Sequence, residues 1–371
     1  MKVLVTGSHG FIGKNLCVIL KKRGHEILDF NSSDSDETLK KAVVEADFIV
    51  HLAGVNRPAD VQEFHDVNFG LTKKIVQFVQ DCGSKAPILL ASSVLAGGDT
   101  PYGQSKALAE SIVNNLGFSG HPVYVYRLAH VFGKWCKPNY NSVVATFCYC
   151  VSHDLPIDIN EKSGNIDFVY IDDVCKEFVR VIEERPQPTN RILSVEPTYT
   201  SKPSELAEII RSFRSSRENL MLPLQDGFEK KLYATYLSFL PEDGMSYPLV
   251  SHSDNRGSFI EFFKTKAYGQ LSVNVIKPGA VKGNHYHMSK NEKYLVVTGS
   301  CDIEERPLFD NKISTYHCSE KNLIVVDIAP GYVHNIKNVG SQDAVVLMWS
   351  SDIYDKTNDD TYPEMVEPEA L

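Results

Sequence analysis

The chain has 371 residues, of which 43% are hydrophobic and 23% charged, and its formal net charge is −9 at pH 7. This is an ordinary globular composition, and the chain is long enough for two domains of ~100–200 residues each. The acidic balance argues against nucleic-acid binding, which requires clustered Lys and Arg. No segment approaches the ~20 apolar residues of a membrane span, and the first residues lack a secretory signal pattern.

Short apolar runs alternate with helical patterns over about the first 245 residues. Strand–helix alternation of this kind predicts an α/β domain with a parallel sheet covered by helices on both faces. The strand-like runs lie at residues 2–7, 25–30, 47–54, 86–93 and 122–133, and the helical patterns at 11–24, 69–83 and 102–117.

The pattern changes after about residue 250, where helical periodicity fades and short strands follow one another. Gly, Pro, Asn and Asp separate these strands, which predicts an all-β barrel or sandwich. The expected strands lie at residues 257–263, 269–276, 292–299, 322–329 and 343–349. Residues 240–257 are rich in Pro, Gly and Ser, and we interpret them as the linker region.

Eight cysteines are spread along the chain, and none forms a CxxC pair. Cys148 and Cys150 lie two positions apart, but within an apolar stretch that is typical of a buried helix. In a long chain without a secretory signal, such residues are expected to be reduced thiols. The cysteine pattern therefore predicts a cytoplasmic protein.

Three glycines separate the first expected strand from the first expected helix. Gly7, Gly10 and Gly13 form a G-x-x-G-x-x-G pattern directly after the strand. Such a loop can turn tightly, approach a pyrophosphate closely and direct the N–H groups of a helix start at its charge. We interpret it as a dinucleotide-binding loop, with a purely structural turn as the alternative.

Tyr102 and Lys106 are four positions apart in a helical pattern, so their side chains lie on one face. A nearby ammonium lowers the cost of forming a phenolate, which allows Tyr102 to exchange a proton near neutral pH. Ser92 and Ser93 end the preceding strand and could hold a carbonyl oxygen beside the phenol. A solvated surface pair of tyrosine and lysine is the alternative.

Six pieces of residues 1–245 resemble the extended short-chain dehydrogenase/reductases that act on nucleotide sugars. They are VTGSHGFIG, DFIVHLAG, VNFGLT, SS…YGQSK, RLAHVFG and DFVYIDDV. The resemblance implies a Rossmann-type doubly wound parallel sheet in which Ser93, Tyr102 and Lys106 are catalytic. Ser92 stays open as the source of the hydroxyl, because the loop from Ser93 to Tyr102 is short.

The same resemblance implies the surroundings of a nicotinamide cofactor. The implied cofactor-binding residues are Gly7, Gly10, Gly13, Leu52, Ala53 and Gly54, and Asn68 matches a further family position. Arg127 and His130 lie at the strand end that would face the nicotinamide and substrate, with His130 where the family frequently has asparagine. Asp29 ends the second strand, where an acid usually bonds the ribose hydroxyls and favours NADH. Lys14 or the FNSS stretch after the strand could instead receive a 2′-phosphate. Biosynthetic reductases of this type normally use NADPH, which we therefore favour over NADH.

Three histidines and a glutamate form the candidate site of the second half. His285 and His287 alternate by two, so on a strand they point to the same face. Glu292 follows after a turn, and His334 lies on a later strand. Three imidazoles and one carboxylate suit Zn²⁺, and also Fe²⁺, Mn²⁺ or Ni²⁺. Unrelated surface histidines are the alternative.

Two stretches around these residues resemble the motifs of the cupin superfamily. Gly279, the paired histidines, Glu292 and Gly299 have the spacing of the first motif, and residues 330–338 are similar to the second. The resemblance implies an all-β cupin barrel over residues 246–371 that binds one divalent metal ion, with Zn²⁺ favoured.

Parts of the same region resemble the nucleotide-sugar 3,5-epimerases of that superfamily, through DNRGSFIEFF, GAVKGNHYH, APGYVHNI and SSDIYD. The resemblance implies substrate contacts from Arg256 and Glu261 and a catalytic base at His285. However, one imidazole nitrogen cannot both bind a metal and abstract a proton. The epimerase tyrosine is replaced near Met348, so the acid/base pair stays open.

Both halves in this order resemble the bifunctional enzymes of capsular polysaccharide biosynthesis. The resemblance implies C3 epimerisation of a UDP-4-keto-6-deoxy-N-acetylhexosamine, then NADPH-dependent C4 reduction to UDP-2-acetamido-2,6-dideoxy-L-talose, on the route to N-acetyl-L-fucosamine. A homodimer is expected, since cupin barrels commonly pair. The alternatives are a reductase whose metal-bound cupin is structural or dimer-forming, a metal-dependent oxygenase, and a cofactor-sensing regulatory N-terminal domain.

Overall fold

The computed structural model describes residues 1–160, 164–188, 191–222, 227–266, 268–355, 357 and 360–367. Its contacts divide the chain into two compact units. The first comprises Met1–Ile210 and Ala234–Pro241, and the second comprises Arg211–Tyr233 and Glu242–Leu371. An α/β half precedes a β half, as expected, while the domain boundary between residues 245 and 246 stays a prediction.

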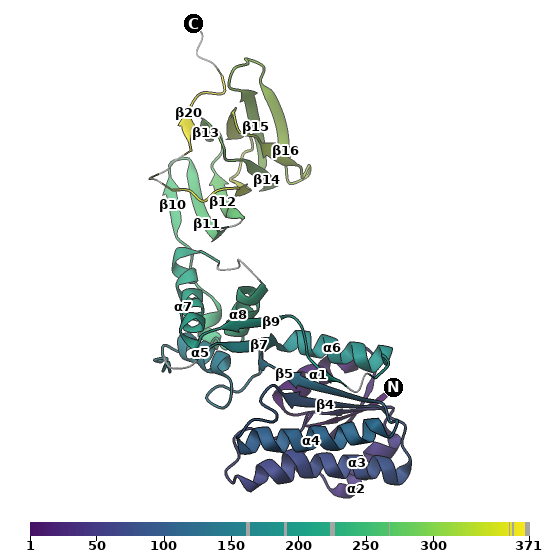
Figure 1. Cartoon of the computed structure of the whole chain (residues 1–371). Coiled ribbons are helices and arrows are strands. Elements are labelled where there is room, and N and C mark those ends of the chain that lie inside the picture. The colour runs from purple at the N-terminus through teal and green to yellow at the C-terminus, as the bar shows by residue number, and fades with distance from the viewer. Residues whose placement is uncertain are drawn as a thin grey trace. The chain divides into compact units, whose positions relative to one another are not determined.

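The main sheet of the first unit has six parallel strands in the order β2-β1-β3-β4-β5-β8 (Figure 1). The chain adds β2 on one side of β1 and β3 on the other, so β1 marks the switch point beyond which α/β sheets bind ligands. The doubly wound parallel sheet is therefore confirmed. Its strands are β1 (Lys2–Thr6), β2 (Glu26–Phe30), β3 (Phe48–His51), β4 (Ile88–Ser93), β5 (Val123–Leu128) and β8 (Ile192–Leu193).

Helices cover both faces of this sheet, because successive residues of a buried strand point to opposite sides. In β1, Val3 and Val5 pack into one core cluster and Leu4 into the other. One face carries α1 (Phe11–Lys22) and α6 (Ile171–Glu184), and the other carries α2 (Asp36–Glu45), α3 (Leu71–Cys82) and α4 (Pro101–Phe118) (Figure 1).

The single strand expected over residues 122–133 is divided between two sheets. After β5, the segment β6 (His130–Phe132) pairs with β7 (Ile166–Tyr170), which also pairs with β9 (Thr198–Ser201). The remaining helical elements are η1 (Phe64–Gly70), α5 (Val143–Ser152), α7 (Pro203–Asn219), α8 (Gly227–Leu237) and η2 (Glu242–Met245). Within the described ranges, no helix combines the length and the apolar character needed to cross a membrane.

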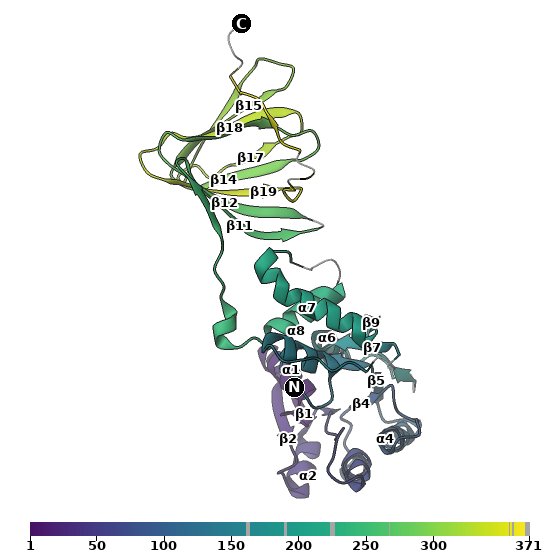
Figure 2. The same ribbon diagram turned by 90° about the vertical axis from the view of Figure 1, so that its left-hand side faces the viewer.

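The second unit contains two antiparallel sheets (Figure 2). Their strand orders are β10-β11-β12-β19-β14-β17 and β16-β15-β18-β13-β20. Ile276 and Val296 from the first sheet share a core with Ile303 and Ile336 from the second. The all-β prediction for this half is confirmed, and closure into a cupin barrel stays a prediction. The strands are β10 (Ser251–Asp254), β11 (Gly257–Thr265), β12 (Gly269–Ile276), β13 (Val281–Tyr286), β14 (Glu292–Thr298), β15 (Ser300–Pro307), β16 (Ser314–Ser319), β17 (Val325–Ile328), β18 (Tyr332–Asn338), β19 (Ala344–Ser350) and β20 (Tyr362–Pro363).

Substitutions of two glycines in the second unit can distinguish the energetic cost of a left-handed backbone from the cost of a steric clash. Gly269 and Gly279 have similar positive φ values, +71° and +75°. A Cβ on Gly269 would lie 1.9 Å from the Ser350 carbonyl oxygen, whereas a Cβ on Gly279 meets no described heavy atom within 4 Å. We expect Gly279→Ala to lower the free energy of unfolding by about 1–2 kcal/mol, the cost of a left-handed residue. Gly269→Ala should cost clearly more, because the β12–β19 pairing must shift.

Urea unfolding followed by Trp349 fluorescence measures both losses. Trp349 lies in β19, and Trp135→Phe removes the other tryptophan of the chain. Equal losses for the two glycine variants would contradict the steric argument.

Candidate functional site

The glycine-rich loop joins β1 to α1 at the carboxyl edge of the main sheet. Gly7 has a φ of +72°, and a Cβ there would lie 2.9 Å from the Cα of Ala53. A Cβ on Gly13 would lie 2.2 Å from the Gly7 carbonyl oxygen. Gly10 occupies the N-cap of α1, whose first turn carries no acidic residue. The helix start can therefore direct its N–H groups at an anion such as a pyrophosphate.

Asn31, in the FNSS stretch that follows β2, contacts this loop through its side chain. Its side-chain oxygen accepts hydrogen bonds from the Ser8 hydroxyl at 3.3 Å and the His9 backbone N–H at 3.2 Å. Asp29 is exposed, and its carboxylate lies 3.9 Å from Nε2 of His9. Lys14 is also exposed, in the first turn of α1. A neutral amide thus occupies the position against the loop, with both predicted charged groups at the surface.

The segment after β3 lies beside both the glycine-rich loop and the predicted catalytic residues. Leu52 and Ala53 donate backbone hydrogen bonds to the last residue of β1. A Cβ on Gly54 would lie 2.8 Å from Oδ1 of Asn68 and 3.3 Å from Nζ of Lys106. This crowding favours a glycine at position 54, and it places the expected cofactor segment against the lysine.

Tyr102 and Lys106 lie on α4, as predicted. Lys106 is only 7% exposed, and its ammonium donates a hydrogen bond to the Ala91 carbonyl oxygen at 3.2 Å. Burial lowers the pKa of Lys106 to about 8, although the charge of Glu110 acts in the opposite direction. Burial raises the pKa of Tyr102, while its hydrogen bond with Ser93 lowers it. The phenol therefore keeps its proton at neutral pH, with a hydroxyl beside it and an ammonium on its own helix.

Ser92 and Ser93 have different surroundings. The buried Ser92 hydroxyl donates to Glu110 at 2.6 Å. Glu110 also accepts hydrogen bonds from Arg127 at 2.7 and 2.9 Å. The Ser92 hydroxyl is bonded to the carboxylate of this partly buried ion pair, while Ser93 hydrogen-bonds the phenol of Tyr102. These contacts favour Ser93 as the hydroxyl of the site.

The four predicted metal ligands gather in the second unit. The ligand atoms of His285, His287, Glu292 and His334 all lie within 4.8 Å of one another. Burial and the neighbouring imidazoles lower the pKa of His285 to about 4. Burial alone would raise the pKa of Glu292, but the adjacent imidazoles outweigh it and hold that pKa well below its usual range. A neutral imidazole and an ionised carboxylate are the forms that bind metals.

The orientation of the imidazoles fits a metal ion. Nδ1 of His287 donates to the Asp360 carbonyl oxygen at 2.5 Å, and Nδ1 of His334 to the Tyr332 carbonyl oxygen at 3.2 Å. These bonds leave the lone pair on Nε2 in both rings. Both Nε2 atoms are buried without a hydrogen-bond partner among the described residues, 3.6 and 3.4 Å from the Glu292 carboxylate. A divalent cation at this point would satisfy them.

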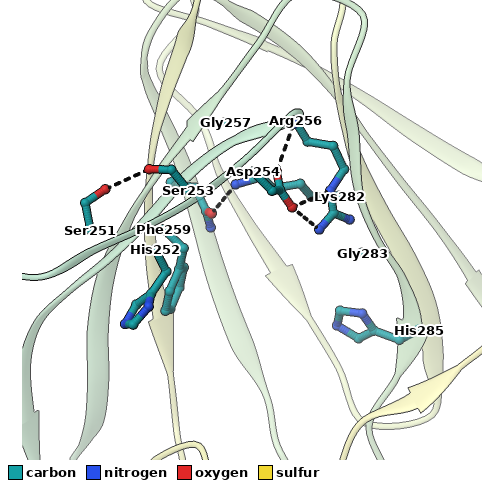
Figure 3. A pocket seen from close by; sticks show the side chains of 11 residues that line it. Ser251, His252, Ser253, Asp254, Arg256, Gly257, Phe259, Lys282, Gly283 and His285 are labelled. Atoms are coloured by element: carbon teal, nitrogen blue, oxygen red, sulfur yellow. Dashed lines mark hydrogen bonds and ion pairs between the residues drawn. The ribbon is translucent and has the colours of Figure 1, made fainter.

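A cavity of about 690 Å³ lies beside this cluster, and its lining includes His285 (Figure 3). Arg256 also lines it, paired with Asp254 at 2.7 Å. Lys282 donates to a backbone carbonyl of β11 at 3.1 Å, and burial lowers its pKa. The volume is typical of a small-molecule site. Glu261 is instead paired with a lysine of its own strand at 2.9 Å.

Further residues support these sites without belonging to any motif quoted above. Glu110 follows Lys106 by four positions on α4, so helical spacing could have revealed it. Tyr294 follows Glu292 by two on β14 and donates a hydrogen bond to its carboxylate at 2.8 Å, which strand alternation could have indicated. Asp360 lies in the C-terminal tail, and no local sequence pattern indicates its hydrogen bond with His287.

Residues 3–195 match the NAD dependent epimerase/dehydratase family, and residues 252–362 match the polysaccharide biosynthesis C-terminal domain. A Pseudomonas aeruginosa PA103 protein, UDP-2-acetamido-2,6-beta-L-arabino-hexul-4-ose reductase, is 44% identical over 98% of this chain and 98% of its own. GDP-6-deoxy-D-talose 4-dehydrogenase of Aggregatibacter actinomycetemcomitans is 30% identical over 50% of this chain and 71% of its own.

Among solved structures, the capsular polysaccharide assembling protein CapF from Staphylococcus aureus superposes with a TM-score of 0.87. It is 41% identical and covers 99% of this chain and 100% of its own. The likeness to CapF thus extends from end to end of the chain. The chain therefore belongs to the NAD dependent epimerase/dehydratase family, and it carries the polysaccharide biosynthesis C-terminal domain after it in sequence.

Proposed function

We propose that the protein is a bifunctional nucleotide-sugar enzyme. Its second half epimerises C3 of a UDP-4-keto-6-deoxy-N-acetylhexosamine, and its first half reduces C4 with NADPH. The product is UDP-2-acetamido-2,6-dideoxy-L-talose, a precursor of N-acetyl-L-fucosamine in a capsular polysaccharide. The carrying observation is the buried Lys106 on the helix of Tyr102, whose phenol hydrogen-bonds Ser93. The activity of the Pseudomonas relative supports the substrate class, and the likeness to CapF supports a role in capsular polysaccharide assembly.

Reduction of a ketone needs a hydride at carbon and a proton at oxygen. The glycine-rich loop would hold NADPH, which would supply the hydride. Tyr102 donates the proton, Ser93 holds the ketone oxygen, and Lys106 stabilises the phenolate that remains. The neutral Asn31 against the loop supports NADPH over NADH, since a carboxylate there would repel a 2′-phosphate.

Epimerisation depends on the acidity of the hydrogen at C3, because the carbanion delocalises into the adjacent ketone. A metal ion held by the three histidines and Glu292, which we propose to be Zn²⁺, would supply a Lewis acid. Arg256 and Lys282 line the cavity and can balance the negative charge of the nucleotide or of the enolate. The acid and the base of the epimerisation are not assigned, because His285 is one of the four candidate metal ligands.

The order of the two reactions follows from the same ketone. Reduction at C4 removes the carbonyl group and with it the acidity of the neighbouring hydrogen. Epimerisation must therefore come first, and hydride addition then traps the inverted centre. Because one chain carries both sites, the protein that forms the epimerised ketone also reduces it.

The alternative is a reductase whose metal-bound second half is structural or dimer-forming. The burial of His287, Glu292 and His334, at 2%, 6% and 0% exposure, favours a structural metal. The position of His285 in the cavity wall favours a catalytic one. The expected homodimer, the cytoplasmic location and the cupin barrel remain predictions.

Tyr102→Phe should separate the two activities. We expect it to slow NADPH oxidation by roughly 10²–10⁴-fold, the usual contribution of a positioned general acid. Deuterium uptake at C3 in D₂O, followed by NMR, should continue at the wild-type rate. Tyr140→Phe, which removes another phenol of the first unit, serves as the control. Loss of both activities in Tyr102→Phe would contradict two separate sites.

The burial of Lys106 predicts how reduction depends on pH. Since burial lowers its pKa to about 8, Lys106 is charged below that pH and neutral above it. The raised pKa of Tyr102 keeps the phenol protonated over the same range. We therefore expect kcat/KM for NADPH to be constant below pH 8 and to fall above it. Lys106→Arg, which stays charged, should flatten this profile. A wild-type profile that stayed level well above pH 8 would refute the role.

His287→Ala tests whether the metal acts in epimerisation. We expect deuterium uptake at C3 to be lost, while a keto sugar that is already epimerised still oxidises NADPH. His317→Ala is the matched control, because His317 is 80% exposed and pairs with Asp302 outside the cluster. Unchanged exchange at C3 in His287→Ala would instead support a structural metal.

A further inference from the structure

The last described segment of the chain, residues 360–367, contacts the cluster of candidate metal ligands through His287. Within it, β20 pairs with β13, and Tyr362 lies opposite Tyr286. The rings of these two tyrosines stack with their centroids 5.2 Å apart. The pairing brings Asp360, at the start of the segment, against His287, which is 73 positions earlier in the sequence.

Asp360 contacts both a ligand and the turn that follows it. Its main-chain carbonyl accepts the Nδ1–H of His287 at 2.5 Å. Its carboxylate accepts backbone hydrogen bonds from Met288 at 2.9 Å, Ser289 at 2.9 Å and Lys290 at 3.0 Å, and one from the Ser289 hydroxyl at 2.8 Å. One residue therefore organises the turn that connects His287, just after β13, to Glu292 at the start of β14.

The bond at Nδ1 decides what Nε2 of His287 can do. An imidazole that donates from Nδ1 presents a lone pair at Nε2, the atom that enters the cluster. Without an acceptor at Nδ1, the ring could rotate or adopt the other tautomer. Partners of this kind orient metal ligands and raise their basicity, and losing one typically weakens metal binding by roughly 10–100-fold.

The far end of the segment is anchored independently of Asp360. The Arg306 side chain, 4% exposed, donates to the carbonyl oxygens of Val366 at 2.7 Å and Met365 at 2.9 Å, and to the Glu364 carboxylate at 2.8 Å. Val366 is fully buried. Asp360→Ala keeps the main-chain carbonyl but removes the carboxylate bonds that hold this end of the segment on the turn after His287. The other end stays attached.

We propose that Asp360 is a positioning residue of the metal centre, fixing His287 through its carbonyl and the following turn through its carboxylate. The C-terminal tail thereby sets how tightly the metal is held. This inference rests on the metal site of the proposed function, and it assigns that site a residue from outside both cupin-like motifs.

Full-length Asp360→Ala should bind Zn²⁺ roughly 10–100-fold more weakly than the wild type in competition with a chromophoric chelator. The visible absorption of the Co²⁺-substituted protein should also change, because it reports ligand geometry rather than stability. Ser289→Ala removes one of the hydrogen bonds to the carboxylate and should give a smaller loss in the same direction. Since Ser289 is exposed, this variant keeps the test valid if Asp360→Ala folds poorly.

Asp355→Ala is the matched control, because Asp355 lies on the same tail and accepts hydrogen bonds from Thr357. It should leave both measurements unchanged, whereas His287→Ala should abolish tight binding. Equal Zn²⁺ affinities and identical Co²⁺ spectra for the wild type and Asp360→Ala would overturn this proposal and leave the metal site standing. A wild-type protein that binds neither ion would overturn the metal site and the role of Asp360 together.

Discussion

The withdrawal of polar groups from water is the constraint on which both candidate sites depend. Lys106 is buried beside Ala91 and near Glu110, and burial lowers its pKa to about 8, so the side chain loses its charge just above neutral pH. In the second unit, burial keeps the imidazole of His285 neutral, and Nε2 of His287 finds no hydrogen-bond partner in the described part of the chain. Such groups destabilise a fold unless they find partners. Lys106 has the Ala91 carbonyl oxygen, and a metal ion is the partner that fits the buried histidine nitrogens.

The proposed reactions give a reason for one chain to carry both sites. A 4-keto sugar is reactive at C3 only while its carbonyl group persists, and the reductase removes that group. The first unit is suited to reducing the ketone, through the glycine-rich loop, Tyr102 and Ser93. The second unit is suited to epimerisation at C3, in the cavity lined by Arg256, Lys282 and His285. The two halves are thus complementary in their proposed chemistry, although one has a parallel main sheet and the other antiparallel sheets.

Local patterns of the sequence predicted much of this architecture. Strand–helix alternation indicated the doubly wound sheet, and spacings of three, four and two residues indicated the glycine-rich loop, the Tyr102–Lys106 pair and the paired histidines. Local patterns could not predict contacts between segments that are distant in the sequence. Nothing local distinguishes Ser92 from Ser93 before Glu110 is seen to engage the former. Likewise, only the folded chain brings Asp360 to His287.

The most direct test of the coupled chemistry is NMR of the product formed in D₂O from the UDP-4-keto sugar, with and without NADPH. Without NADPH, we predict deuterium at C3 and an intact ketone. With NADPH, the product should carry deuterium at an inverted C3 and a hydroxyl group at C4, with one NADPH oxidised for each sugar. A product that retains its original hydrogen at C3, or an NADPH pool that is never oxidised, would contradict the account.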